Sequence, residues 1–173
     1  MSSIIAEIAF ELSRHRTLVE RCLAQTSDEH FFHRPGPQSN SIALVIKHLA
    51  GNLYSRWSAF GASDGDKPLR DRDAEFVLAG EDSRAGLMAA WERGWLSLQE
   101  VLDSLKEDRL GEIVLIRGEP HRVQQALLRA LDHVAYHAGQ ILYVARWLNP
   151  TAAWITIEPG KSREHTKAYL QLP

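Results

Sequence analysis

The sequence predicts an all-α fold, a four-helix bundle with a short β-hairpin before the fourth helix. Four long segments carry apolar residues at intervals of three and four, as an amphipathic helix requires. Polar or proline-containing stretches separate these segments, and one short β-branched run precedes the last of them. Helices with one apolar face bury those faces against one another, so four of them favour a bundle. The predicted helices cover residues 3–25, 39–60, 82–105 and 121–148.

The first predicted helix, residues 3–25, has an apolar face that includes one histidine, His15. Cys22 lies on the same face, which predicts a buried small side chain rather than a nucleophile. The next segment, 26–38, contains the sequence PGP at 35–37 and is predicted to be a loop, because these residues break helices. The apolar face consists of Ile5, Ile8, Leu12, His15, Val19 and Cys22.

The second and third helices are each preceded by residues that commonly cap helices. The second is predicted to begin between Ser39 and Ser41, and the third at Asp82 or Ser83. The segment 61–73 between them is a polar loop rich in turn-forming residues.

Residues 110–123 are predicted to form a hairpin directly before the fourth helix. Residues 113–116 are apolar and mostly β-branched, and Arg-Gly-Glu-Pro follows them as a turn. The fourth helix is expected to end before Pro150. In the mixed tail, Ser162 is a suitable cap for a final short helix.

Composition and charge argue against several classes of protein. The chain has 173 residues, a formal net charge of −2 and one cysteine. This length predicts one domain, residues 1–173, with a substantial core. The 20 basic residues are scattered, so we expect no nucleic-acid partner. We also expect no signal peptide, no membrane span and no internal disulfide, and a cytoplasmic location fits the single cysteine.

His133 and His137 lie four residues apart in the fourth helix, beside its apolar face. Two imidazoles at this spacing can reach one metal ion, although two hydrogen-bonded histidines fit the spacing as well. His48 of the second helix and His15 of the first are the candidates for a third ligand. His48 lies off the apolar face, beside small or polar residues. It fits either a surface position or a pocket in which small neighbours such as Gly51 leave room for a ligand.

Several segments together resemble the DinB/YfiT-like superfamily, and most closely a branch of uncharacterised bacterial DinB-like proteins. The resemblance extends from the second helix to Ser162. It rests on NSIALVIKHLAGNLYSRW at 40–57, SDGDKPLRDRDAEF at 63–76, IRGE at 116–119, HVAYHAGQI at 133–141 and IEPGKS at 157–162.

This resemblance implies an up-down-down-up bundle that binds zinc or nickel through His48, His133 and His137. It also implies a homodimer, because many members of the superfamily are dimers. Characterised relatives include thiol-dependent S-transferases and a maleylpyruvate isomerase. The branch itself has no established substrate, so no particular activity is implied for this chain.

Three histidines would leave a metal ion with an open position, which is typical of catalytic rather than structural sites. A water there favours hydrolysis, and a low-molecular-weight thiol favours thiol transfer to a small-molecule substrate. The zincin signature places a glutamate after its first histidine, whereas this chain has Val134. Asp132 is expected to project away from His133. These observations favour thiol transfer over hydrolysis, and a non-enzymatic, dimeric metal-binding stress-response module is the alternative.

Other residues have weaker assignments. Asn52, Arg56 and Gln140 are candidates for the lining of the pocket, although each also fits an ordinary polar helix position. Arg117 in the hairpin turn could bind an anionic substrate or face solvent. A second aromatic stripe on the fourth helix predicts a homodimer contact. It consists of Tyr136, Tyr143 and Trp147.

Overall fold

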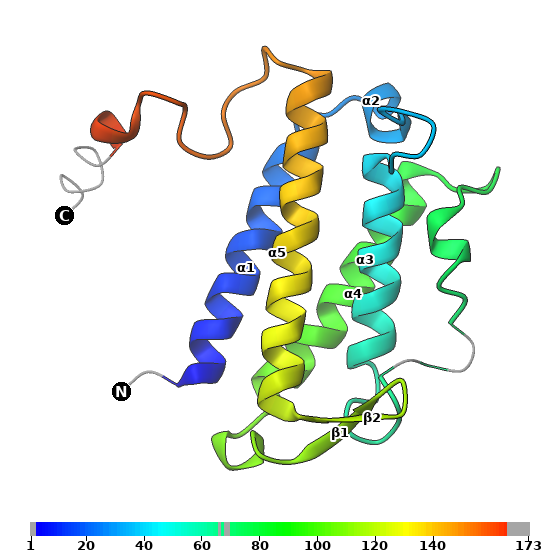
Figure 1. The fold of residues 1–173 in the computed structure, drawn as a ribbon, viewed down its shortest axis with the longest axis vertical. Helices are drawn as coiled ribbons and strands as arrows, with labels where there is room; N and C mark the ends of the chain where they lie inside the picture. Colours follow the sequence, from blue (N-terminus) through cyan, green and yellow to red (C-terminus); the bar gives the residue numbers. More distant parts are fainter. Residues whose placement is uncertain (1–2, 66, 68–69, 166–173) are drawn as a thin grey trace.

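A computed structural model describes residues 3–65, 67 and 70–165 of the chain (Figure 1). Its four long helices are α1 (Ile4–Leu23), α3 (Ile42–Trp57), α4 (Arg84–Ser104) and α5 (Val123–Leu148). The shorter elements are α2 (Asp28–Phe32), the 3₁₀ helices η1 (Ala74–Phe76) and η2 (Glu107–Arg109), and the strands β1 (Ile113–Ile116) and β2 (Glu119–Arg122). The prediction of a helical bundle with one short hairpin is confirmed.

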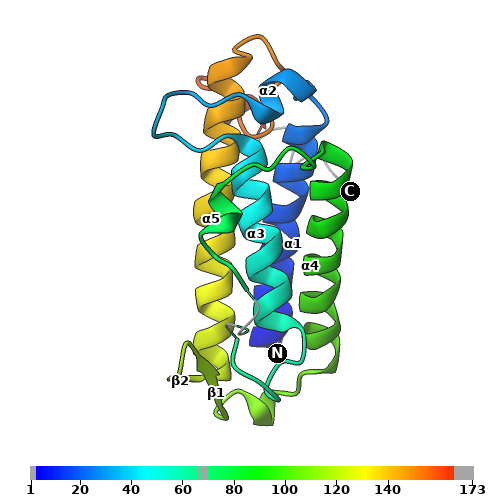
Figure 2. The same ribbon diagram turned by 90° about the vertical axis from the view of Figure 1, so that its right-hand side faces the viewer.

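The four long helices run in up-down-down-up order. α1 and α5 run in one direction and pack side by side, whereas α3 and α4 run in the other direction and pack against each other (Figures 1 and 2). Because α3 and α4 are parallel, the chain must return along the length of the bundle between them. The described residues between α3 and α4, namely 58–65, 67 and 70–83, form this return segment, which carries η1 against the side of α3.

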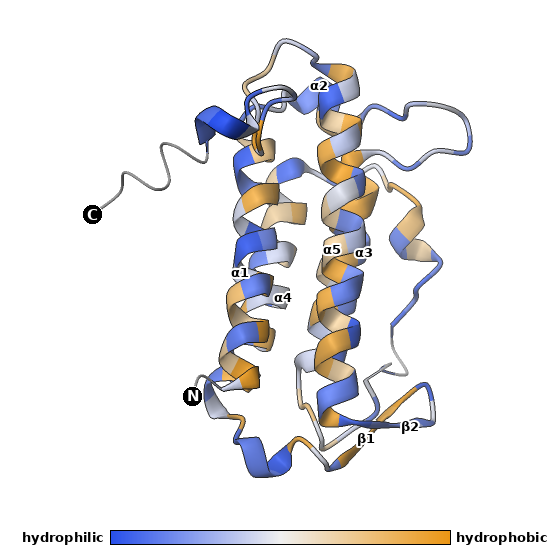
Figure 3. Ribbon diagram, turned by 60° about the vertical axis from the view of Figure 1, so that its left-hand side comes forward, coloured by the Kyte–Doolittle hydropathy of each residue, from blue (hydrophilic) through white to orange (hydrophobic). Residues whose placement is uncertain are grey.

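The apolar faces of the long helices meet in one core. Trp57 of α3 and Trp91 of α4 are fully buried in it. The two helices approach closely at Gly94, where a Cβ would lie 2.9 Å from the carbonyl oxygen of Ala50. Each long helix carries polar as well as apolar residues (Figure 3), as expected when one face is buried and the other is solvated.

The predicted helix boundaries hold to within a few residues. Ser41 and Ser83 cap α3 and α4 as expected, each accepting a hydrogen bond from a backbone amide of the first turn. The prediction of a loop over 26–38 was wrong in one part, because α2 begins after Ser27 within it. A five-residue helix is too short to show an apolar period, so the sequence pattern could not reveal it.

The predicted hairpin is present, with β1 and β2 paired antiparallel. Arg117 and Gly118 form its turn with φ angles of 58° and 73°, the left-handed conformation that a two-residue hairpin loop requires. The carboxylate of Asp64 accepts hydrogen bonds from both turn amides, at 2.8 and 2.7 Å. Asp64 thereby ties the hairpin to the return segment. The paired residues are Ile113 and Arg122, Val114 and His121, Leu115 and Pro120, and Ile116 and Glu119.

Side chains of α3 hold the return segment at two places. The Ser55 hydroxyl donates to the carbonyl oxygen of Gly65 at 3.2 Å and accepts from the amide of Lys67 at 3.1 Å. Nearer the start of α3, the Lys47 ammonium forms an ion pair with Asp82 at 2.7 Å. η1 lies between these two anchors, so its position beside α3 is fixed.

After α5, the chain becomes helical again over 162–165, beginning at the serine that was expected to cap a last helix. The residues that would continue this helix lie outside the described part of the chain. Within the described residues, no helix is both long enough and apolar enough to cross a membrane.

Candidate metal centre

His48 lies on the side of α3 that the return segment covers, and only 2% of the residue is exposed. Its ring stacks on that of Phe76 in η1, with centroids 4.6 Å apart. The apolar pattern of the helix left a surface position and a pocket position equally open for this histidine. His48 is buried because the return segment covers it. The apolar period of α3 could not predict the path of that segment.

His133 and His137 lie one turn apart on α5 and meet His48 across the space between the two helices. Nε2 of His133 is 3.2 Å from Nε2 of His48 and 3.1 Å from Nε2 of His137. The structure therefore brings together the three histidines that the family resemblance implies as ligands.

Hydrogen bonds on the other side of two rings determine where their protons lie. Nδ1 of His48 is 2.8 Å from Oε2 of Glu75, and Nδ1 of His137 is 2.8 Å from the amide oxygen of Gln140. In a neutral imidazole, the nitrogen that faces an oxygen acceptor carries the proton and the other keeps a lone pair. Both Nε2 atoms therefore direct lone pairs at Nε2 of His133, which itself holds at most one proton.

Nε2 of His133 contacts two other nitrogens but can donate a proton to only one of them, so hydrogen bonds satisfy at most one of the two contacts. A divalent ion bound by all three nitrogens suits this arrangement better. Two nitrogens bound to a tetrahedral zinc ion at about 2.0–2.1 Å lie roughly 3.3 Å apart. The distances of 3.1 and 3.2 Å agree with this value, and the three donor atoms all lie within 4.8 Å of one another. The three histidines are thus positioned to hold a metal ion, and imidazole donors suit transition metals rather than magnesium or calcium.

A buried ion pair supports His48 from behind. Nε and Nη2 of Arg70 donate to the two carboxylate oxygens of Glu75 at 2.7 and 2.8 Å, and Glu75 is itself 7% exposed. Burial alone would raise the pKa of Glu75, but hydrogen bonds from His48 and Arg70 outweigh it and the pKa is lowered. An ionised carboxylate in this position fixes the tautomer of a ligand histidine and increases its basicity.

The two histidines of α5 resist protonation. Burial, and to a smaller extent the charges of the neighbouring histidines and arginines, together lower the pKa of His133 to about 3. Burial also lowers the pKa of His137, more strongly than its hydrogen bond to Gln140 raises it. Both rings are therefore neutral near pH 7, which is the form that binds metals.

A cavity of about 180 Å³ lies beside His48 and His133. Three arginines of its lining are exposed, so the cavity reaches the surface of the molecule. Apart from the two histidines, it is lined by Asn52, Arg56, Arg72, Arg117, Arg129, Ala130 and Asp132.

The chain matches, over residues 2–161, the family described as Protein of unknown function (DUF1572). The chain belongs to the DUF1572 family. No curated protein matches it.

Among solved structures, a conserved protein from Enterococcus faecalis is similar to this DUF1572 chain, with 21% identity and a TM-score of 0.69. That match covers 84% of this chain and 97% of the other. A DinB-like protein of Bacillus subtilis, YjoA, has 16% identity and a TM-score of 0.60, with coverages of 87% and 97%. At these identities the likeness shows the fold alone, which is DinB-like as the resemblance implied.

The residues expected to line the pocket of this DUF1572 protein fall in two places. Asn52 and Arg56 line the cavity beside His48. Gln140 instead contacts Nδ1 of His137 and lines a separate cavity of about 370 Å³ between α5 and the start of α3. Its amide therefore reaches the three-histidine cluster through His137. Asp132, expected to project away from His133, shares the cavity lining with it.

Among the described residues, the cluster that could hold a metal ion consists of His48, His133 and His137 alone. The other candidates for ligation or catalysis lie outside it. His15, the alternative third ligand, is half-buried on α1. The other histidines lie elsewhere in the chain. They are His30 on α2, His33 directly after it, His121 on β2 and His165 in the tail.

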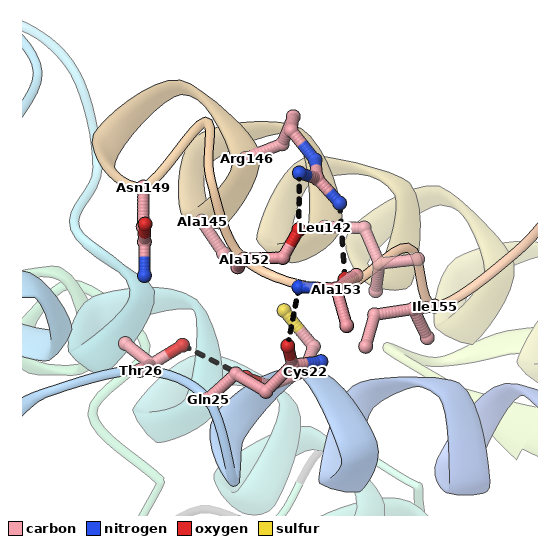
Figure 4. A pocket seen from close by; sticks show the side chains of 10 residues that line it. All are labelled: Cys22, Gln25, Thr26, Leu142, Ala145, Arg146, Asn149, Ala152, Ala153 and Ile155. Atoms are coloured by element: carbon pink, nitrogen blue, oxygen red, sulfur yellow. Dashed lines mark hydrogen bonds between the residues drawn. The ribbon is translucent and has the colours of Figure 1, made fainter. Parts of the chain in front are cut away.

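Cys22 lies in a third, smaller pocket between α1, the end of α5 and the segment after it (Figure 4). Arg146 donates to the carbonyl oxygens of Ala152 and Ala153 at 2.7 and 3.0 Å, and the Ala153 amide donates to Gln25 at 2.8 Å. The cavity measures about 30 Å³, enough for about one water molecule. Burial raises the pKa of the Cys22 thiol. Cys22 is therefore buried, as predicted, and its surroundings do not favour a nucleophile.

The sequence analysis missed Arg70 and Glu75 behind His48, and also Arg72 and Arg129 in the lining of the cavity. The one signal was Gly51, whose small size predicted free space beside His48. The carboxylate of Glu75 takes up this space, since a Cβ on Gly51 would lie 2.2 Å from its Oε1.

Proposed function

We propose that His48, His133 and His137 bind one zinc or nickel ion and that the chain is a metal-dependent enzyme acting on a small molecule. The observation that supports this most strongly is the convergence of three imidazole nitrogens that share at most one proton. Three histidines leave a coordination position open, whereas structural zinc sites are usually closed by four protein ligands. The polar cavity beside two of the histidines supports access from solvent to that position.

When bound, the ion would supply Lewis acidity that lowers the pKa of a thiol or a water molecule at its open position. The protein's own groups prepare the three donors. Glu75 and Gln140 hold the protons of His48 and His137 on Nδ1, so that both Nε2 atoms remain available. The low pKa of His133 keeps its ring unprotonated in mildly acidic solution as well.

The first reaction that we propose is transfer of a low-molecular-weight thiol to an electrophilic carbon. The thiol releases its proton to solvent, a carbon–sulfur bond forms, and the leaving group departs with the electron pair of its bond to carbon. The activated thiol is itself the nucleophile, so the reaction requires no positioned carboxylate base. This agrees with Val134 at the place where zincins carry their glutamate.

The test of thiol transfer uses cysteine or glutathione with 1-chloro-2,4-dinitrobenzene, from which chloride leaves. We expect turnover with zinc- or nickel-loaded protein and none above background with metal-free protein. The His133→Ala, His137→Ala double variant should lose it, whereas His165→Ala, changed at an exposed position in the tail, should retain it. Equal rates in the metal-free and metal-loaded protein would contradict the proposal.

Hydrolysis is the second candidate, and the position of Asp132 favours it. This carboxylate lines the same cavity as two of the histidines and could accept a proton from a water molecule there. If the protein is a hydrolase, Asp132→Asn should abolish cleavage of p-nitrophenyl esters while zinc content stays unchanged. Metal binding without turnover in either assay would instead favour the non-enzymatic metal-binding module.

A further inference from the structure

Four arginines from four different parts of the chain line the cavity beside His48 and His133. They are Arg56 of α3, Arg72 of the return segment, Arg117 of the hairpin turn and Arg129 of α5. The sequence places these residues far apart, and their cationic side chains are collected only by the fold.

The scaffold fixes where three of these four arginines stand. Arg56 is 9% exposed and lies two turns along α3 from His48. Arg117 stands in a turn whose amides are both bonded to Asp64. Arg129 lies one turn before His133 on α5 and donates through Nη1 to Nε2 of His121 at 3.0 Å. Three of the four arginines therefore stand on two helices and a braced turn, as a preorganised site requires, and Arg72 joins them from the return segment.

The lining contains four arginines and one carboxylate, that of Asp132. The positive charge of guanidinium groups gathered in one cavity attracts an anion placed among them. The planar fork of arginine matches the paired oxygens of a carboxylate or phosphate group. The cavity volume of about 180 Å³ is below the ~300–1,000 Å³ typical of sites for drug-sized ligands, so a small anion fits it best.

We propose that this cavity binds the carboxylate or phosphate group of a small organic anion and holds its other end toward His48 and His133. This inference rests on the proposed function, because it names the substrate class of the same centre. Arg56, buried beside the histidines, would contact the ligand nearest the metal. Arg72, Arg117 and Arg129, exposed at the rim, would draw the anion in and hold its outer oxygens.

The test is isothermal titration of zinc-loaded and metal-free protein with succinate, with 1,4-butanediol as the uncharged analogue. Inorganic phosphate, titrated into metal-free protein, distinguishes a phosphate site from a carboxylate site. We expect succinate or phosphate to bind metal-free protein, more weakly as salt rises, and butanediol not to bind. The Arg72→Gln, Arg129→Gln variant should weaken binding at least about tenfold, as expected from lost charge-assisted hydrogen bonds. Arg93→Gln, changed at an exposed position of α4 outside the cavity, should bind as the wild type does.

Zinc content measured in the same samples separates this inference from the proposed function. Anion binding by a protein that takes up no zinc would support the arginine site and contradict the proposal that the protein is a metal-dependent enzyme. Two results would overturn the inference: no binding of either anion, or binding that requires zinc and is the same in the Arg72→Gln, Arg129→Gln variant. The second result would mean that the anion ligates the metal rather than the arginines.

Discussion

Gly51 and Glu75 are in such close contact that a Cβ on Gly51 would lie 2.2 Å from Oε1 and 2.8 Å from the carboxylate carbon. A side chain at position 51 would therefore push the carboxylate away from Nδ1 of His48. We predict that Gly51→Ala lowers zinc affinity by about 10- to 100-fold, the usual effect of losing a partner behind a ligand histidine. Competition with a chromophoric chelator measures this.

Gly139→Ala is the matched control for this substitution. Gly139 also lies within a long helix, but a Cβ there would have no neighbour within 4 Å. Both changes bring the same gain in helix propensity, about 1 kcal/mol. Wild-type zinc affinity in both variants would contradict a role for Glu75 in positioning His48.

The ion pair between Arg70 and Glu75 should also stabilise the metal-free protein. Glu75→Gln removes the ionised carboxylate to which the Arg70 guanidinium donates, and the Arg70 side chain is 5% exposed. Loss of one partner of a buried pair typically costs about 3–5 kcal/mol, so we expect a clear drop in the free energy of unfolding in urea. The exposed pair between Glu11 and Arg14 serves as the control, because Glu11→Gln should cost less than about 1 kcal/mol. Similar losses in the two variants would argue against the buried pair.

The stability of the metal-free protein should depend on pH through the histidines of α5. In the unfolded chain, His133 takes up a proton as the pH falls through its ordinary value of 6.5, whereas in the folded chain it does so only near 3. The unfolded state therefore binds more protons between these values, and the free energy of unfolding falls as the pH falls. Urea unfolding at pH 7 and pH 5 measures this. The His133→Asn variant should lose less stability on acidification than the wild type, and equal losses would contradict the prediction.

The aromatic stripe on α5 leads to a prediction about assembly. Tyr136, Tyr143 and Trp147 are 63%, 75% and 55% exposed, and burying such rings is a common reason for association. We expect the protein to sediment as a homodimer at micromolar concentration. Tyr143→Ser with Trp147→Ser should shift it toward the monomer. Phe10→Ser, changed at an exposed aromatic residue of α1, is the control and should leave the dimer intact. A monomeric wild type would contradict the predicted interface.

The bundle could be predicted because each long helix carries its own apolar period, and four such faces have few ways to pack. The metal centre could be predicted only in part. The i, i+4 spacing identified His133 and His137, but periodicity does not say which helix lies opposite them. His15 therefore competed with His48 as the third ligand, although a buried core histidine was the favoured interpretation of His15, until the resemblance was considered. Arg70 and Glu75 lie in a segment without a period, and its path depends on contacts with α3 made by Ser55 and Lys47.

The metal content of the protein tests the central claim most directly. Untagged protein, purified without a metal column, would be analysed by mass spectrometry beside the His133→Ala, His137→Ala variant. We predict about one zinc or nickel ion per chain in the wild type and none in the variant. A wild type that holds no metal and takes up neither zinc nor nickel when they are added would contradict the claim. The three rings would then be held by hydrogen bonds alone.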